Sequence, residues 1–346
     1  MGEGSRALTR RRVLAACGSI LGVAACGASP SGSSSAPTRA AASPPPSASP
    51  PAPPAPLFEL HSGFWINLHL RLHHAATGRR PAPDAAPRSP SGAAWDDAVA
   101  YYRRRFGQRG GFGLIFDPEL VQLGRLLGVH RHDLPLTGVD PDLARHLELA
   151  AEALGPGWSA NDELNTAWMR ALQPHLARHG APMVKEIDRI YGATWPAEPI
   201  RVEVSPFAGP VGAYTVSDPP LTVISSADPG YAGDASLEMI FHEASHLFSD
   251  PLEKAIAQAA AKRGHEPPRD LWHAVLFFIG GEIAKKQLGP SYVPYADKTG
   301  MWSRWSAYEA PVRRECPRVL GGTASLQAAA EAMVAALPPE APVAPG

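Results

Sequence analysis

The spacing of hydrophobic positions predicts a chain that is mostly helical. Apolar residues recur at helical intervals from Leu57 to Ala76 and again from Ala93 to Phe106, with a proline-rich loop between them. Similar patterns return further along the chain, at residues 141–154, 162–179 and 182–191. Proline and glycine separate these segments, so the sequence predicts several distinct helices in the first half of the folded part.

The pattern changes between Ile200 and Ser225. Three short segments rich in β-branched residues, IRVEV, GAYTV and LTVIS, are separated by Gly, Pro and Asp, as is typical of a small antiparallel sheet. Helical patterns then resume to the end of the chain, at residues 234–249, 251–263, 268–288, 301–314 and 325–337. We therefore expect a mainly helical α+β fold in which a small antiparallel sheet precedes the helix that begins near Asp234.

The first 26 residues have the features of an export signal rather than of the fold. The segment from Thr9 to Leu14 resembles a twin-arginine signal, and Val23 to Cys26 resembles a lipobox. The apolar stretch from Val13 to Ala25 is too short to cross a bilayer, which needs about 20 residues. These residues predict a protein of the bacterial cell envelope, anchored to a membrane by a lipid on Cys26 and facing the periplasm or the exterior.

Residues 27–56 are rich in Pro, Ser and Ala, a composition that cannot bury a core, and we expect them to form a disordered tether. The folded domain is then residues 57–346. Once the signal is removed, only Cys26 and Cys316 remain, so no intramolecular disulfide is expected. The formal net charge of −1 includes no concentration of basic residues, which argues against nucleic acid as a partner.

The segment HEASH, from His242 to His246, is the clearest candidate for chemistry. Two histidines four positions apart project from the same face of a helix and can bind one metal ion together. The surrounding positions are apolar and free of Pro and Gly, as a buried helix requires, and Glu243 is the only charged residue within the motif. The sequence therefore predicts a zinc site.

With these residues in place, the chain resembles the zincin metallopeptidases and, among them, the gluzincins. The resemblance covers Leu221 to Tyr295, roughly a fifth of the chain. It implies a zinc ion bound by His242, His246 and a Glu from a later helix, with Glu243 as the general base that activates water. It also implies a peptide substrate whose backbone pairs with an edge strand, here LTVIS.

The third ligand is predicted to be Glu282, which lies on an apolar helix that could pack antiparallel to the motif helix. Glu266 and His273 remain as alternatives. Glu266 precedes two prolines at the start of a helix, and His273 lies on the same predicted helix as Glu282. A metzincin-type site is disfavoured because the sixth residue after the motif is Leu252 and not a histidine.

Tyr295, and with it Tyr292, is a candidate for the donor that stabilises the oxyanion. His69 and His73 also have metal-ligand spacing, but without an adjacent acidic base they indicate a polar helix face. Two other functions remain open: a zinc hydrolase or amidase that does not act on peptides, and a lipid-anchored binding protein with a non-catalytic metal site.

Overall fold

The computed structural model describes residues 55–78, 90–209 and 211–338. The predicted signal peptide, Cys26 and nearly all of the tether lie outside the described residues. None of the described helices is long and apolar enough to cross a membrane. The described elements are, in order, β1 (Phe58–His61), α1 (Phe64–Thr77), α2 (Ala93–Phe106), η1 (Gly107–Arg109), α3 (Gly113–Phe116), α4 (Pro118–Val129), α5 (Pro141–Tyr191), β2 (Ile200–Ser205), β3 (Ala213–Val216), β4 (Leu221–Ser225), η2 (Pro229–Tyr231), α6 (Asp234–Ser245), η3 (His246–Phe248), α7 (Asp250–Ala261), α8 (Leu271–Leu288), α9 (Tyr295–Lys298), η4 (Met301–Trp305), α10 (Ser306–Leu320) and α11 (Leu326–Ala335).

The expected class, α+β and mainly helical, is confirmed, but the sheet is mixed rather than antiparallel. Its strand order is β1-β2-β4-β3, with β1 parallel to β2, β2 parallel to β4, and only β3 antiparallel to β4. The antiparallel pair is β3 and β4, which follow each other in the chain and form a hairpin. In the sheet, β4 lies between β2 and β3 and runs parallel to β2. The segment LTVIS is therefore an interior strand, and β3 is the outer strand on this side of the sheet.

The strand β1 occupies positions that the sequence pattern assigned to the start of a helix. Its residues pair with β2 in register, Phe58 opposite Ile200 and His61 opposite Glu203. The helix α1 begins only at Phe64. Pairing with a strand about 140 positions away stabilises β1, and local periodicity cannot detect such a partner.

Alternating side chains of the sheet enter two separate hydrophobic cores, as the period of two in a strand requires. Val202 and Val204 of β2 lie in one core with α6, α7, α8, α10, α11 and the second half of α5. Tyr214 of β3 and Val223 of β4 lie in the other, with α1, α2, α4 and the first half of α5. Because apolar residues cover both faces, even polar Thr222 within β4 is fully buried.

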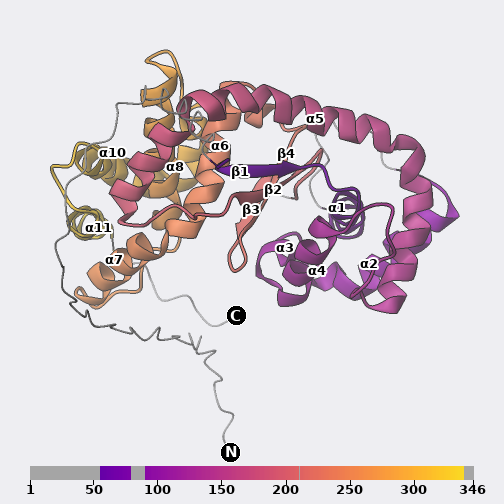
Figure 1. Cartoon of the computed structure of the whole chain (residues 1–346). Coiled ribbons are helices and arrows are strands. Elements are labelled where there is room, and N and C mark those ends of the chain that lie inside the picture. The colour runs from indigo at the N-terminus through magenta and orange to yellow at the C-terminus, as the bar shows by residue number, and fades with distance from the viewer. Residues whose placement is uncertain (1–54, 79–89, 210, 339–346) are drawn as a thin grey trace, which may run out of the picture. The chain divides into compact units, whose positions relative to one another are not determined.

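The helix α5 replaces the three shorter helices expected between residues 141 and 191. It is continuous over 51 residues, although Pro156, Pro174 and Pro182 lie inside it. Proline removes one backbone hydrogen bond and usually ends a helix. Here α5 contacts α1 and α2 along its first part and α6 and α8 along its last part, and these contacts offset the lost hydrogen bonds. Figure 1 shows α5 passing from one group of helices to the other.

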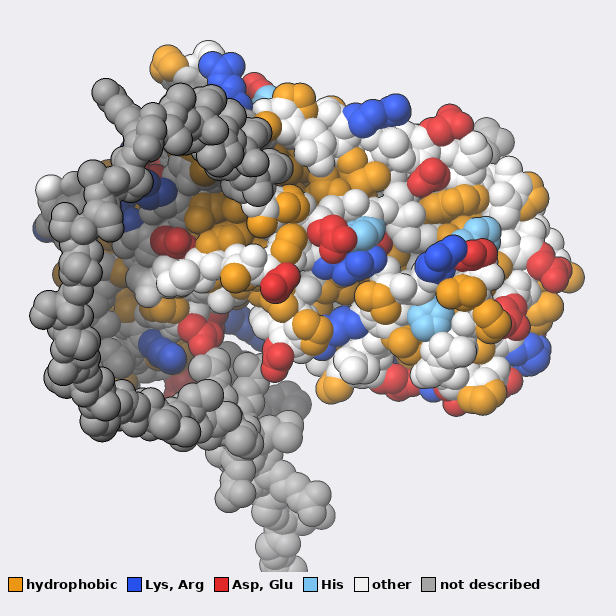
Figure 2. All heavy atoms as spheres, viewed as in Figure 1, with side chains coloured by type: hydrophobic (Ala, Val, Ile, Leu, Met, Phe, Trp, Pro, Cys, Tyr) orange, Lys and Arg blue, Asp and Glu red, His pale blue; other side chains and the backbone are white. Residues whose placement is uncertain are grey.

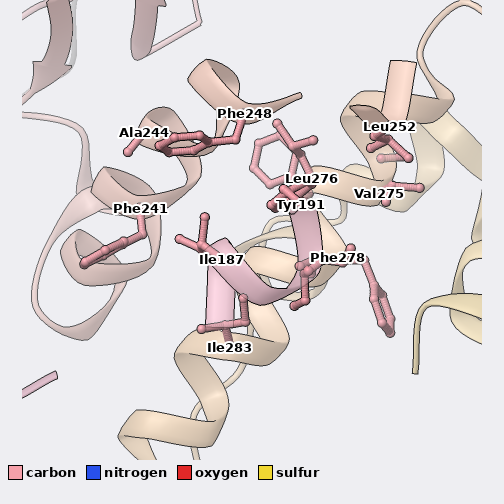
Figure 3. Packing of buried hydrophobic residues seen from close by; sticks show 14 of the residues in the cluster. Ile187, Tyr191, Phe241, Ala244, Phe248, Leu252, Val275, Leu276, Phe278 and Ile283 are labelled. Atoms are coloured by element: carbon pink, nitrogen blue, oxygen red, sulfur yellow. The ribbon is translucent and has the colours of Figure 1, made fainter. Parts of the chain in front are cut away.

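The packing between α5, α6 and α8 fixes the relative position of the latter two helices. Figure 3 shows Ile187 and Tyr191 of α5 among side chains of α6 and α8, including Phe241 and Leu276. All four are 3% exposed or less. Burying one such side chain contributes about 1.5–3 kcal/mol, so α6 and α8 have little freedom to move apart.

On the face of the molecule seen in Figure 2, acidic and basic side chains are interspersed among apolar ones.

Candidate metal centre

The histidines of the HEASH segment lie on one continuous helical face. The helix α6 starts after its N-cap Gly233, whose positive φ of 59° suits glycine. The last turn changes to the 3₁₀ helix η3 at His246, but His246 keeps helical backbone angles (φ −58°, ψ −27°). The rings of His242 and His246 are consequently neighbours, with centroids 5.1 Å apart.

A third histidine reaches the same place from α8. The ring of His242 stacks on Phe277 at 3.7 Å, whereas Glu238, one turn earlier on α6, faces Gly281. Lower residue numbers on α6 thus meet higher ones on α8, which shows that the two helices are antiparallel. This arrangement brings His273 beside both motif histidines. The side-chain nitrogens of His242, His246 and His273 all lie within 4.8 Å of one another, and this is the only such group of three among the described residues.

The structure does not bring Glu282 into this group. Glu282 follows His273 by nine residues on α8, which places it about 13 Å further along the helix and on the opposite side. Its charge acts instead on Glu238. Glu266 is exposed in the connection between α7 and α8. The structure therefore places His273, one of the two alternatives, beside the motif histidines, and it does not place Glu282 there.

Burial favours the neutral form of all three histidines. Burial, and then the charge of His273, lowers the pKa of His246 to about 3. Burial, and then the charge of Arg304, lowers the pKa of His273 to about 4. Burial likewise lowers the pKa of His242 well below its usual value, with smaller effects from the other two histidines. Neutral imidazole is the form that binds metal ions.

The one ring-nitrogen separation closest to hydrogen-bond range, between His242 and His273, equals the ligand separation at a tetrahedral zinc ion. The Nε2 atoms of His242 and His273 are 3.3 Å apart. Two nitrogens that each lie about 2.05 Å from a tetrahedral zinc ion would be separated by about 3.3 Å. Three histidine nitrogens also leave the fourth tetrahedral position free, which is the arrangement of catalytic rather than structural zinc sites.

Glu243 lies next to His242 in the sequence and is held by the outer strand of the sheet. Its side chain is buried, and the Oγ1 of Thr215 on β3 donates a hydrogen bond of 3.0 Å to its Oε2. Thr215 also bonds Thr222 across the hairpin, at 2.9 Å. Burial raises the pKa of Glu243 to about 8, and the hydrogen bond from Thr215 opposes this increase. The sequence pattern gives no sign of the hydrogen bond from Thr215 to Glu243, because this contact depends on the pairing of β3 with β4 and on their packing against α6.

Tyr295 lies one aromatic ring away from His242. Its ring is 5.9 Å from Phe277, which itself stacks on His242, and its side chain is hydrogen-bonded to that of Tyr231. Its backbone N–H donates to Glu238 at 2.9 Å. The hydroxyl of Tyr292 also donates to Glu238, at 2.6 Å. The hydroxyl of Tyr292 thus donates to Glu238, whereas the ring of Tyr295 lies on the far side of Phe277 from His242.

The N-terminal pair, His69 and His73, is buried in the second core and does not form the polar face expected from the sequence. His69 contacts the hydroxyl of Tyr102 at 3.1 Å. Burial, and then the charge of His73, lowers the pKa of His69 to about 3.

No known protein family has a model that matches this chain. No curated protein and no solved structure matches it either.

Proposed function

We propose that this protein is a zinc-dependent metallopeptidase in which His242, His246 and His273 hold the metal ion. The observation that supports this proposal is the meeting of three neutral ring nitrogens within 4.8 Å, beside a buried carboxylate on the same helix. Zinc bound by three histidines would lower the pKa of a water in the fourth position and polarise the scissile carbonyl. A structural site would need neither a free fourth position nor Glu243.

Glu243 is proposed as the general base and proton carrier. Its carboxylate is fixed by the hydrogen bond from Thr215 and shielded from bulk water, so it would take a proton from the attacking water and pass it to the leaving amine. The pKa of Glu243, raised to about 8 by burial, applies to the protein with no metal ion bound. A divalent cation close to a carboxyl group favours the ionised form, as a base requires.

We assign substrate binding to β3 rather than to LTVIS, because β3 is the outer strand next to the motif helix. An extended peptide could add to this edge by main-chain hydrogen bonds. The hydroxyl of Tyr295 is proposed to donate to the oxyanion. With export and a lipid on Cys26, the substrate would be a peptide of the cell envelope or its surroundings.

The zinc content of the full chain tests the metal site. We expect about one zinc per chain in the wild type and in Glu282→Ala, and a large loss of affinity in His273→Ala. The two variants remove side chains from the same helix, so Glu282→Ala is a matched control. A folded wild type that binds no zinc, or a His273→Ala chain that binds it as tightly, would refute the site.

Glu243→Gln tests the catalytic part of the proposal. It should keep the zinc and lose the hydrolysis of a mixture of peptides. If the zinc-loaded wild type cleaves non-peptide amides but no peptide, the site belongs to an amidase. If it cleaves neither class of substrate, the metal site is non-catalytic and the protein is a binding protein.

A further inference from the structure

A hollow of about 240 Å³ lies at the N-terminal end of α8, the helix that carries His273. Trp305 forms one wall, and its ring is 5.4 Å from the ring of His273. Asp270, which accepts a hydrogen bond from the backbone N–H of His273, lies on another side. Pro268 and Leu337 add apolar surface. The hollow is therefore within one helical turn of a proposed metal ligand.

Arg304 brings a positive charge to this hollow. Its side chain is exposed and forms no hydrogen bond or ion pair with the described residues, and the same holds for the side chain of Asp270. By contrast, Arg313 and Arg318 on the neighbouring helix α10 are ion-paired with nearby carboxylates.

We propose that Arg304 binds the free C-terminal carboxylate of the substrate, so that the enzyme removes residues from the C-terminal end of peptides. This inference rests on the proposed peptidase function and narrows it to one class of substrate. A guanidinium group binds a carboxylate through two parallel hydrogen bonds, which gives orientation as well as affinity. Trp305 and Pro268 would pack against the last side chain, while Asp270 would disfavour an acidic one.

Asp270, which lines the hollow, precedes His273 by three residues, a rise of about 4.5 Å along α8. We therefore expect a carboxylate held in the hollow to belong to a residue close to the bond at the metal.

The test uses two peptides that end in lysine and differ only in the terminus, one with a free carboxylate and one with a carboxamide. Cleavage is measured with the zinc-loaded full chain, and binding is measured with the zinc-loaded Glu243→Gln chain, which should not turn the peptides over. Each measurement is repeated with Arg304→Gln and with Arg263→Gln. Arg263 is another exposed arginine without an ion pair among the described residues, and it controls for the loss of one positive charge.

We expect the wild type to cleave and bind the free acid about 10- to 100-fold better than the amide, the range of one charged hydrogen-bonded pair. Arg304→Gln should remove this preference, and Arg263→Gln should keep it. Equal treatment of the two peptides by the wild type, or an unchanged preference in Arg304→Gln, would overturn the inference. A preference in binding without any cleavage would instead refute the peptidase function and leave the carboxylate site standing.

Discussion

Glu238 is a buried carboxyl group whose ionisation should couple the stability of this protein to pH. Its side chain is fully buried on α6, where it accepts hydrogen bonds from the hydroxyl of Tyr292 and the backbone of Tyr295. Burial raises its pKa from 4.5 to about 7, and the two hydrogen bonds only partly oppose this increase. The folded state therefore favours the protonated carboxyl.

The sign and size of the effect follow from linkage between protonation and folding. Because the pKa of Glu238 is higher in the folded than in the unfolded state, its contribution to stability is complete below about pH 4.5 and is lost as the pH rises through about 7. An increase of about 2.5 pKa units corresponds to about 3 kcal/mol, as an order of magnitude. Glutamine at this position stays neutral, so Glu238→Gln should lack this loss.

The assay is urea unfolding of the metal-free full chain, wild type and Glu238→Gln, at several pH values from about 4 to about 8. The free energy of unfolding of the variant, relative to the wild type, should increase with pH by up to about 3 kcal/mol. Glu152→Gln, at an exposed position of α5, controls for the removal of a carboxylate. A difference between wild type and Glu238→Gln that stays constant over the whole range would refute the reasoning.

Three further predictions follow from the same site. Thr215→Val removes the hydrogen bond to Glu243 with little change in side-chain volume. We expect kcat/KM to fall about tenfold while the zinc content stays the same. A loss of zinc in this variant would contradict a role of Thr215 confined to Glu243. Gly281→Ala should lower the free energy of unfolding by about 1–3 kcal/mol, because the added Cβ would lie 2.7 Å from Pro294 and 3.2 Å from Glu238. Urea unfolding measures this change. An unchanged free energy of unfolding would show that the neighbouring side chains move aside without cost. Zinc at a hundred times its dissociation constant should raise the free energy of unfolding by about 2.7 kcal/mol. The same increase in the His273→Ala variant would show that zinc binds at another place.

Local patterns correctly identified much of the fold. The helix α2 and the strands β2, β3 and β4 lie where the periodicity predicts them, since their apolar spacing reflects the faces that they bury. The helix α4 was not predicted, although Asp117 caps it and Pro118 starts it. The strand β1 and the continuous helix α5, which were misjudged, depend on partners distant in sequence. Neither strand pairing nor the tolerance of prolines within a packed helix is encoded locally.

The sequence by itself determined that two histidines and a glutamate share one buried helical turn, because a spacing of four residues places His242 and His246 on the same face wherever that helix packs. Only the tertiary structure decided which residue joins them. The direction and offset of α8 against α6 bring His273, not Glu282, to the motif, and the insertion of β4 leaves Thr215 on the outer strand beside Glu243. Both outcomes depend on how core side chains interlock between elements, a property of the packed chain rather than of any segment of it.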